Sequence, residues 1–143
     1  MKSKLNFNKK VCNVFLVLFL LTASFKAVAQ EIKSSSLKDF NVIIEKTENG
    51  IKMKNVKGGS WVDLSFNLNN YQPQAVDEYG MVELDKVSSI KDKNLTDFLI
   101  TIIKTDTGIE LKGIEGTAWT ELKFSLAENE KQSINQYGMT SLN

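Results

Sequence analysis

Apolar and polar residues alternate along several short stretches of this chain. The clearest stretch is 62–68, in which every second residue is apolar: Val62, Leu64, Phe66 and Leu68. Period-two alternation, with β-branched and aromatic residues at the apolar positions, is typical of a strand that buries one face. The same pattern predicts strands at about 40–45 and 51–56. Shorter apolar runs at 74–76 and 81–84 predict a fourth and a fifth strand.

The same arrangement returns 58 residues later in the chain. Residues 31–84 align with residues 89–142 without a gap, and 21 of the 54 aligned positions are identical. A gapless match of this length indicates an internal duplication, which defines the repeating unit of the fold. We therefore predict a second set of strands at 98–103, 109–114, 122–126, 132–134 and 139–142.

Glycines mark the predicted turns. Gly50 and Gly108 follow the first strand of each copy, and we predict a type I turn in which they take a left-handed conformation. The phrase Tyr-Gly-Met at 79–81 and 137–139 predicts a second shared turn with glycine at its end. For residues 73–80 the sequence also allows a helical turn, which would begin at a proline and end before a glycine.

The fold class that these patterns predict is all-β. We expect a tandem duplication of an antiparallel meander of about four to five strands per copy. One copy is small for a stable domain and has no disulfide to support it, and repeats commonly gain stability by burying a face against each other. We therefore expect the copies to pack as one pseudo-twofold sandwich or partly open barrel, with two small β domains in tandem as the alternative.

Residues 1–29 are typical of a cleaved secretory signal peptide. Lysines come first, about fifteen mostly apolar residues follow, and Ala-Val-Ala ends the segment at Ala29. The apolar run is shorter than the roughly 20 residues of a membrane-spanning helix, which is the alternative. The composition, rich in Lys and Asn, suggests a bacterial protein, and we predict export to the periplasm or the medium. The first copy then occupies 30–84, a linker 85–88, and the second copy 89–143.

Cleavage would change the charge of the chain. All 18 basic residues are lysines, five of them lie in the first 29 residues, and all 17 acids lie beyond. The exported chain would keep 13 lysines against those 17 acids and carry a net charge of −4. Nucleic-acid binders present basic faces, and anionic membranes attract basic segments. We therefore expect no nucleic-acid partner and no membrane insertion after cleavage.

The sequence offers few reactive side chains. The chain has no His, and its one Cys, Cys12, lies in the predicted signal peptide. A nucleophile needs a base beside it, and zinc or copper sites use His or Cys. We therefore expect no catalytic residue, no metal site and no cofactor, and a protein that is not an enzyme. Residues 106–108 read Asp-Thr-Gly, as in aspartic proteases, but those enzymes use two facing aspartates. The equivalent residues 48–50 read Glu-Asn-Gly, so we predict a hairpin turn at both places.

Four aromatic residues remain as candidates for a binding surface: Trp61, Trp119, Tyr79 and Tyr137. Strand alternation places both tryptophans on the polar face, where exposed rings could stack on a sugar or on a partner's side chain. In the alternative interpretation each tryptophan closes the edge of the core or fills the interface between the copies, because tryptophan is usually largely buried. The two tyrosines lie in the last turn of each copy, where they could line the same surface or pack against their own hairpin.

The sequence therefore favours a non-enzymatic binding protein whose partner is a protein or a glycan of the cell envelope. Duplication would give two equivalent surfaces, and two weak sites bind a repetitive target better than one. The first alternative is an accessory or inhibitory protein for another exported enzyme, acting through strand edges or loops. The second is an enzyme that uses carboxylates and lysines such as Lys46 and Lys104, although recurrent charges on alternating strands usually mark solvated faces or cross-strand pairs.

Overall fold

The structure is a computed structural model that describes residues 36–84, 86 and 90–142. The predicted signal peptide at 1–29, the start of the first copy and most of the predicted linker at 85–88 lie outside these residues. The described part of the chain contains no helix, and so none that could cross a membrane. Its strands are β1 (Asn41–Lys46), β2 (Gly50–Lys57), β3 (Asp63–Asn67), β4 (Pro73–Asp77), β5 (Gly80–Val82), β6 (Leu99–Lys104), β7 (Gly108–Glu115), β8 (Glu121–Ser125), β9 (Lys131–Asn135) and β10 (Gly138–Thr140). These bounds confirm both sets of predicted strands, and β4 and β5 exclude the helical turn at 73–80.

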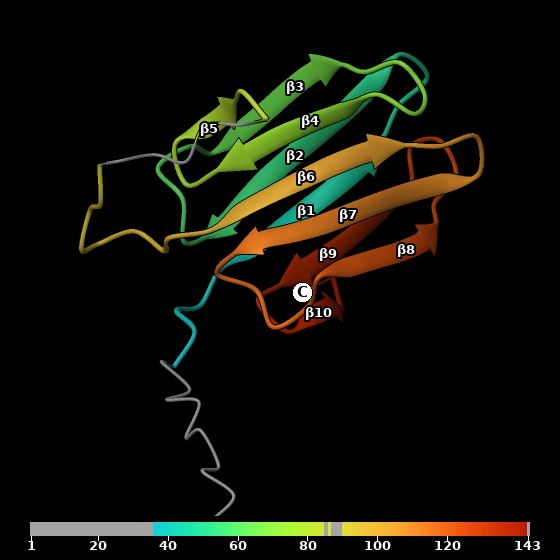
Figure 1. The fold of residues 1–143 in the computed structure, drawn as a ribbon. Coiled ribbons are helices and arrows are strands. Elements are labelled where there is room, and N and C mark those ends of the chain that lie inside the picture. Colours follow the sequence, from blue (N-terminus) through green and yellow to red (C-terminus); the bar gives the residue numbers. More distant parts are fainter. Residues whose placement is uncertain (1–35, 85, 87–89, 143) are drawn as a thin grey trace, which may run out of the picture. The chain divides into compact units, whose positions relative to one another are not determined.

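The strands form two antiparallel sheets of five strands each (Figure 1). Sheet A has the order β10-β9-β1-β2-β3, and sheet B has the order β5-β4-β6-β7-β8. Figure 1 shows sheet B lying in front of sheet A. The sheets do not close into a barrel, so the structure confirms an all-β sandwich.

Each sheet contains strands of both copies. The last hairpin of each copy pairs with the first strand of the other copy, so that β9 lies beside β1 in sheet A and β4 lies beside β6 in sheet B. The two pairings have the same register, since Asn41 lies opposite Asn135 and the equivalent Leu99 lies opposite Asp77. The body is therefore pseudo-twofold, as predicted, and the exchange of hairpins excludes the alternative of two separate domains.

The core lies between the sheets and takes equivalent residues from both copies. The inner faces form one continuous cluster that includes Ile44 and Ile102 on the two first strands. Phe40 and Phe98, which are also equivalent, stack with ring centroids 4.7 Å apart and an angle of 21° between their planes. Apolar burial between the two sheets is the main source of stability, and neither copy could supply it alone.

Two pairs of glycines shape the turns for different reasons. Gly80 and Gly138, in the Tyr-Gly-Met turns, have φ angles of 128° and 129°, so the predicted shared turn is confirmed. Gly50 and Gly108 do not have a positive φ, and the predicted left-handed conformation is wrong. These two glycines allow a close approach instead, because a Cβ at either position would collide with a backbone carbonyl oxygen of the neighbouring strand, β3 or β8.

Two buried lysines tie the copies together. Lys46 and Lys104 each expose 6% of their surface. Lys46 Nζ donates to the Asp106 carbonyl oxygen at 2.8 Å, and Lys104 Nζ donates to the Glu48 carbonyl oxygen at 2.7 Å. Each bond joins the first strand of one copy to the first hairpin of the other, and hydrogen bonding offsets part of the cost of burying the charge. The expectation that these recurrent lysines lie on solvated faces or in cross-strand pairs is therefore wrong, because both are buried and bond to backbone carbonyl oxygens of the other copy.

Candidate functional site

The strand directions define two ends of the sandwich. One end, named here the Trp end, holds the connections 58–62, 78–79, 116–120 and 136–137 and the described residues 90–98 that lead into β6. The other, named the hairpin end, holds the connections 47–49, 68–72, 105–107 and 126–130. In Figure 1 the Trp end lies on the left.

Trp61 and Trp119 are buried at the Trp end, each with 9% of its surface exposed. Their indole N–H groups donate to the carbonyl oxygens of Asp77 and Asn135, both at 3.0 Å. Each bond joins the two sheets, because Trp61 precedes β3 of sheet A and Asp77 lies in β4 of sheet B. The interpretation that each tryptophan closes the edge of the core is confirmed, and the two rings do not form an exposed stacking platform.

The placement of the tryptophans on the polar face by strand alternation is wrong for a local reason. β3 begins at Asp63 and β8 begins at Glu121, so each tryptophan lies in the turn before its strand. Alternation does not extend into these turns, where Gly58 and Gly116 have φ angles of 102° and 74°. The turn redirects the chain, and the ring enters the core.

Tyr79 and Tyr137 lie in the β4–β5 and β9–β10 turns at the same end, and both are exposed. The Tyr79 hydroxyl donates to the Ile90 carbonyl oxygen at 3.1 Å. Tyr137 exposes 68% of its surface. The structure therefore brings the four predicted residues to one end of the molecule but leaves only the tyrosines accessible, and their role in binding stays a prediction.

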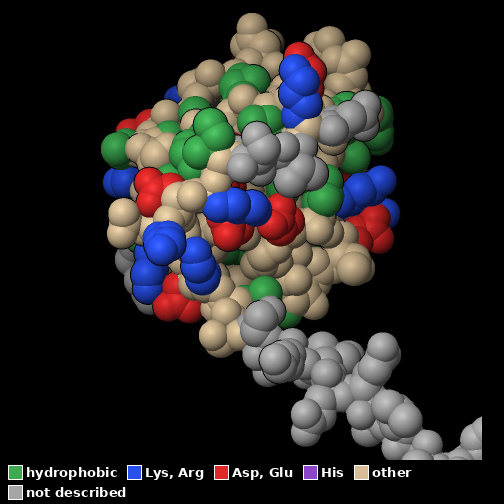
Figure 2. All heavy atoms as spheres, turned by 60° about the vertical axis from the view of Figure 1, so that its left-hand side comes forward, with side chains coloured by type: hydrophobic (Ala, Val, Ile, Leu, Met, Phe, Trp, Pro, Cys, Tyr) green, Lys and Arg blue, Asp and Glu red, His purple; other side chains and the backbone are tan. Residues whose placement is uncertain are grey.

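Exposed large hydrophobic side chains are concentrated at the Trp end. Those in its connections or at the adjoining strand ends are Val56, Val62, Tyr79, Met81, Ile90, Ile114, Tyr137 and Met139, whereas the equivalent Leu84 and Leu142 follow β5 and β10, which run away from this end. In the connections of the hairpin end, all of which are described, Tyr71 is the one such residue. Figure 2, which turns the Trp end forward, shows hydrophobic side chains above a group of lysine and acidic side chains. Apolar surface with a polar rim is typical of an interaction site.

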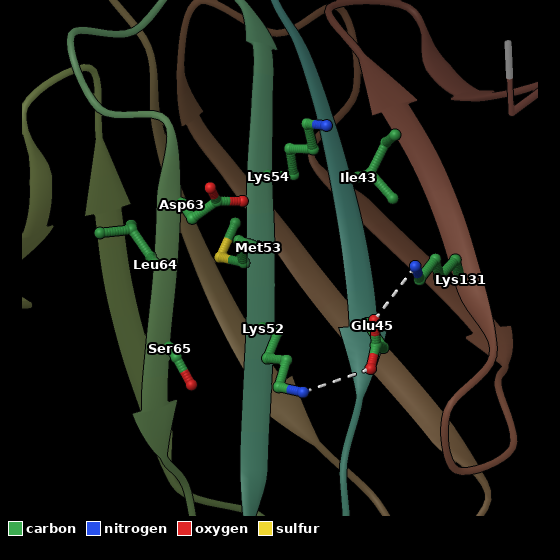
Figure 3. Close-up of a pocket in the computed structure, with 9 residues that line it drawn as sticks. All are labelled: Ile43, Glu45, Lys52, Met53, Lys54, Asp63, Leu64, Ser65 and Lys131. Carbon is green, nitrogen blue, oxygen red and sulfur yellow. Dashed lines mark ion pairs between the residues drawn. The ribbon is translucent and has the colours of Figure 1, made fainter.

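A groove of about 420 Å³ lies on the face of sheet A that points away from the core (Figure 3). It is lined by Ile43, Glu45, Lys52, Met53, Lys54, Asp63, Leu64, Ser65 and Lys131. The Glu45 carboxylate lies between two lysines, 3.8 Å from Lys52 Nζ and 3.4 Å from Lys131 Nζ. The Glu45 carboxylate offsets part of the positive charge of the two lysines, so the groove would attract an anion only weakly. Ion pairs that are open to solvent also contribute little binding energy.

The equivalent face of sheet B carries different chemistry. Ile103, Glu110 and Pro73 stand there in place of Glu45, Lys52 and Lys131, respectively. The charge pattern of the groove is therefore not repeated on sheet B. The expectation that duplication gives two equivalent surfaces does not hold for the outer sheet faces.

A second hollow, of about 490 Å³, lies at the hairpin end and is lined by Glu48, Asn49, Asn67, Leu68, Asn69, Asn70 and Lys104. Several of its polar groups already bond within the protein. Lys104 Nζ donates to the Glu48 carbonyl oxygen, and Asn70 Nδ2 donates to Asp106 Oδ1 at 2.6 Å. A ligand would have to displace these bonds, which makes the hollow a weaker candidate than the Trp end.

The Asp-Thr-Gly triplet at 106–108 lies at the β6–β7 hairpin, as predicted. The Asp106 carboxylate accepts a hydrogen bond from the Tyr71 hydroxyl at 2.7 Å and one from Asn70. These bonds, together with the charge of Lys46, hold the pKa of Asp106 below its usual range. Within the described residues, no group of three or more His, Cys, Asp or Glu side chains is arranged to hold a metal ion. The triplet therefore fixes a loop.

The chain was also compared with known proteins. No protein-family model, curated protein or solved structure matches it. The geometry of the Trp end is therefore the basis for a functional proposal.

Proposed function

We propose that this chain is an exported, non-enzymatic binding protein and that its partner is another protein, which docks on the Trp end. The concentration of exposed hydrophobic side chains at that end carries the proposal, and Val62, Tyr137 and Met139 are among them. Large exposed apolar patches commonly mark interaction sites, and Tyr and Met are enriched where proteins meet. Export is supported by the sequence pattern of residues 1–29.

The Trp end is well supported by hydrogen bonds between its turns. The Ser60 N–H donates to the Glu78 carbonyl oxygen at 2.7 Å, and the equivalent Ala118 N–H donates to the Gln136 carbonyl oxygen at 2.7 Å. Both bonds, like those of the tryptophans, connect turns that belong to different sheets. A preorganised surface loses less conformational entropy on binding than a flexible one, which supports docking of a partner.

A glycan partner is less favoured than a protein partner. The glycan hypothesis relied on exposed tryptophan rings, and both rings are buried. The groove on sheet A contains no aromatic residue among those that line it. Titration of a cell-envelope glycan is therefore a useful control, and we expect no binding.

An accessory or inhibitory role toward another exported enzyme is the second candidate, and the strand edges favour it. Within the described residues, β3, β5, β8 and β10 each pair on one side only. Free strand edges can accept an additional strand from a partner. β3 and β8 have five residues each, whereas β5 and β10 have three, so the longer pair offers the better edge.

Site-specific cross-linking in the native cell tests the proposal. A photoreactive amino acid replaces Tyr137 at the Trp end, and Glu128, which is exposed at the hairpin end, is replaced as the matched control. We expect one dominant cross-linked protein from position 137 and none from position 128. Equal cross-linking from both positions would contradict docking at the Trp end.

Binding of the partner so identified is then measured with matched charge substitutions. Val62→Asp should weaken binding at least about tenfold, or ~1.4 kcal/mol, because it buries a charge in an apolar contact. Thr107→Asp adds the same charge at the hairpin end and should leave the affinity unchanged. Unfolding midpoints must show that both variants are folded, and an unchanged affinity of folded Val62→Asp would refute the proposed surface.

A further inference from the structure

The two copies differ at one buried position of the Trp end. Gln136, after β9, corresponds to Glu78, after β4. Both are buried, with 5% and 3% of their surface exposed. Each lies near the aspartate that precedes the first strand of the other copy, Gln136 near Asp39 and Glu78 near Asp97. We name these equivalent places the Gln corner and the Glu corner.

In the Gln corner the side-chain amide bonds to both of its neighbours. Gln136 Nε2 donates to Asp39 Oδ1 at 2.9 Å, and Gln136 Oε1 accepts from the Phe40 backbone N–H at 3.2 Å. The amide thus supplies one donor and one acceptor. Hydrogen bonds from Lys57 and Gln136 hold the pKa of Asp39 below its usual range, so this aspartate is ionised.

In the Glu corner an ionised carboxylate could make only one of these two bonds. Burial raises the pKa of Glu78, and the N–H of Phe98, which is the equivalent of Phe40, acts in the opposite direction. Glu78 Oε1 and Asp97 Oδ1 are buried and have no hydrogen-bond partner. They correspond to the donor and the acceptor that are joined in the Gln corner. Asp97 Oδ1 has an ion pair with Lys91 at 3.8 Å but no hydrogen bond. Two buried acceptors without a hydrogen bond are costly, and one proton between them would satisfy both.

Acidic groups dominate the surroundings of Glu78. Asp77 precedes it in the same turn, and Asp97 faces it from the residues before β6; both raise its pKa. Asp92, in the residues 90–98 that lead into β6, lies near the Tyr79 hydroxyl beside it. A negative charge on Glu78 would therefore be opposed from its own hairpin and from the connection that packs against it.

The lysines near this corner bind other acids more closely. Lys91 Nζ lies 2.7 Å from Glu115 and 3.8 Å from Asp97. Lys38 Nζ lies 4.0 Å from Asp97. Within the described residues, neither lysine forms an ion pair with Glu78. Glu78 is among the acids that raise the pKa of Lys91, after Glu115 and Asp97, so this lysine gives Glu78 only weak electrostatic support.

We propose that Glu78 and Asp97 bind one shared proton in the folded protein, carried by Glu78 as a carboxylic acid that donates to Asp97 Oδ1. This O–H···O bond takes the place of the N–H···O bond between Gln136 and Asp39. The proton comes from solvent during folding. The inference concerns the folded chain alone and does not depend on the proposed function.

The shared proton makes stability depend on pH. Burial raises the pKa of Glu78 above its ordinary value of 4.5, and Asp77 and Asp97 raise it further. The unfolded chain therefore loses this proton at a lower pH than the folded chain does. The stabilisation is complete below the unfolded pKa, decreases as pH rises above it, and is lost once pH passes the folded pKa.

Reciprocal exchange of amide and carboxyl tests the inference. Glu78→Gln gives both corners an amide, and Gln136→Glu gives both a carboxyl. Urea unfolding is measured from about pH 4 to about pH 9 on the chain from residue 30, which contains the whole compact unit 35–143. Between the pKa of Glu78 in the unfolded chain and its pKa in the folded chain, the wild type should release about one proton on unfolding. Glu78→Gln should remove this pH dependence of the free energy of unfolding. Gln136→Glu should add a second pH dependence of similar size.

Two further measurements distinguish the shared proton from an ionised Glu78 and from a bound cation. The NMR shift of the Glu78 carboxyl carbon in the wild type should titrate with a midpoint clearly above 4.5. A midpoint at 4.5 or below, or a Glu78→Gln variant with the wild-type pH dependence, would overturn the inference. In a final control, calcium is added at about pH 8. If calcium stabilises the wild type but not Glu78→Gln, the corner binds a cation in place of the proton, which would also overturn the inference.

Discussion

The two Trp corners of the sandwich hold the same ring by different means. In the first copy the Asn55 side-chain amide donates to the Trp61 carbonyl oxygen at 2.9 Å. In the second copy Gly113 stands in place of Asn55, and the Thr117 hydroxyl donates to the Trp119 carbonyl oxygen at 2.7 Å. The fold requires a donor for this carbonyl group, but it does not require the donor to come from one particular residue.

In each copy the two residues that support the tryptophan depend on each other, so they can be exchanged between the copies only as a pair. A Cβ at Gly113 would collide with Thr117 Oγ1 and with the Trp119 carbonyl oxygen. The glycine is therefore linked to the threonine, just as Asn55 is linked to Gly59, whose carbonyl oxygen it also bonds at 3.0 Å. The Glu and Gln corners follow the same logic, because the geometry is kept while the donor changes from N–H to O–H.

The largest effect is expected where the copies are the same. Phe40→Ala and Phe98→Ala each remove one ring of the stacked pair and should each destabilise the protein by about 3–5 kcal/mol, since both rings are fully buried. The double variant should lose less than the sum, because the two rings contact each other. Urea unfolding at one pH measures all three values. A large loss in one single variant and a small loss in the other would show that the copies contribute unequally to the core.

A smaller effect is expected where the copies differ. Gly113→Asn should cost about 2–3 kcal/mol, because the new side chain has no space beside Thr117. Adding Thr117→Gly recreates the residue pair of the first copy and removes the clash with the threonine but not the one with the Trp119 carbonyl oxygen, so it should recover part of that loss. Thermal and urea unfolding of the single and double variants provide the comparison.

Asn55→Gly is the control for this exchange. It removes the hydrogen bonds of the Asn55 side chain to Trp61 and Gly59 without creating a clash, so it should cost about 1–3 kcal/mol, the value of an unsatisfied buried polar group. Additive losses in Gly113→Asn and Thr117→Gly, with no recovery in the double variant, would show that the two corners are not interchangeable sets.

The strands and the pseudo-symmetry could be predicted from sequence, but the hairpin exchange could not. Alternation and the gapless repeat define strands and copies directly. The sequence does not say whether β4 pairs with β1 of its own copy or with β6 of the other copy, because β1 and β6 carry the same pattern and pair in the same register. A sequence in which both choices satisfy the same periodicity does not distinguish pairing within a copy from pairing between copies.

The candidate site was predicted in part. The four aromatic residues do gather at one end, but the burial of the tryptophans depends on turn geometry that alternation does not describe. For the buried lysines a signal was present. Lys46 continues the inward series Phe40, Val42 and Ile44, and Lys104 does the same in the second copy. A charge that is identical in both copies and in phase with the core indicates a buried partner.

The smallest expected effect concerns the hairpin end, where two equivalent loops are held differently. Tyr71 and Asn129 have φ angles of 65° and 64°, and this left-handed region suits asparagine far better than tyrosine. Their backbone N–H groups donate to the carbonyl oxygens of Lys104 and Lys46 at 2.7 and 2.8 Å. The Tyr71 hydroxyl has an additional bond to Asp106, at 2.7 Å, which helps to keep the residue in its strained conformation.

Acid should therefore loosen one of these loops before the other. Hydrogen bonds from Tyr71 and Asn70 lower the pKa of Asp106 below 3.8, so the loop is held above that pH and released as pH falls through the lower, folded value. The amide protection factor of Tyr71, corrected for intrinsic exchange, should fall on acidification, while that of Asn129 stays constant. Asp106→Ala should reproduce the loss at neutral pH, and Glu48→Ala, at the equivalent position, should not affect Asn129. Equal loss of protection at both amides would mean that backbone hydrogen bonds alone hold the two loops, and that the tyrosine, despite its strain, contributes no more than the asparagine.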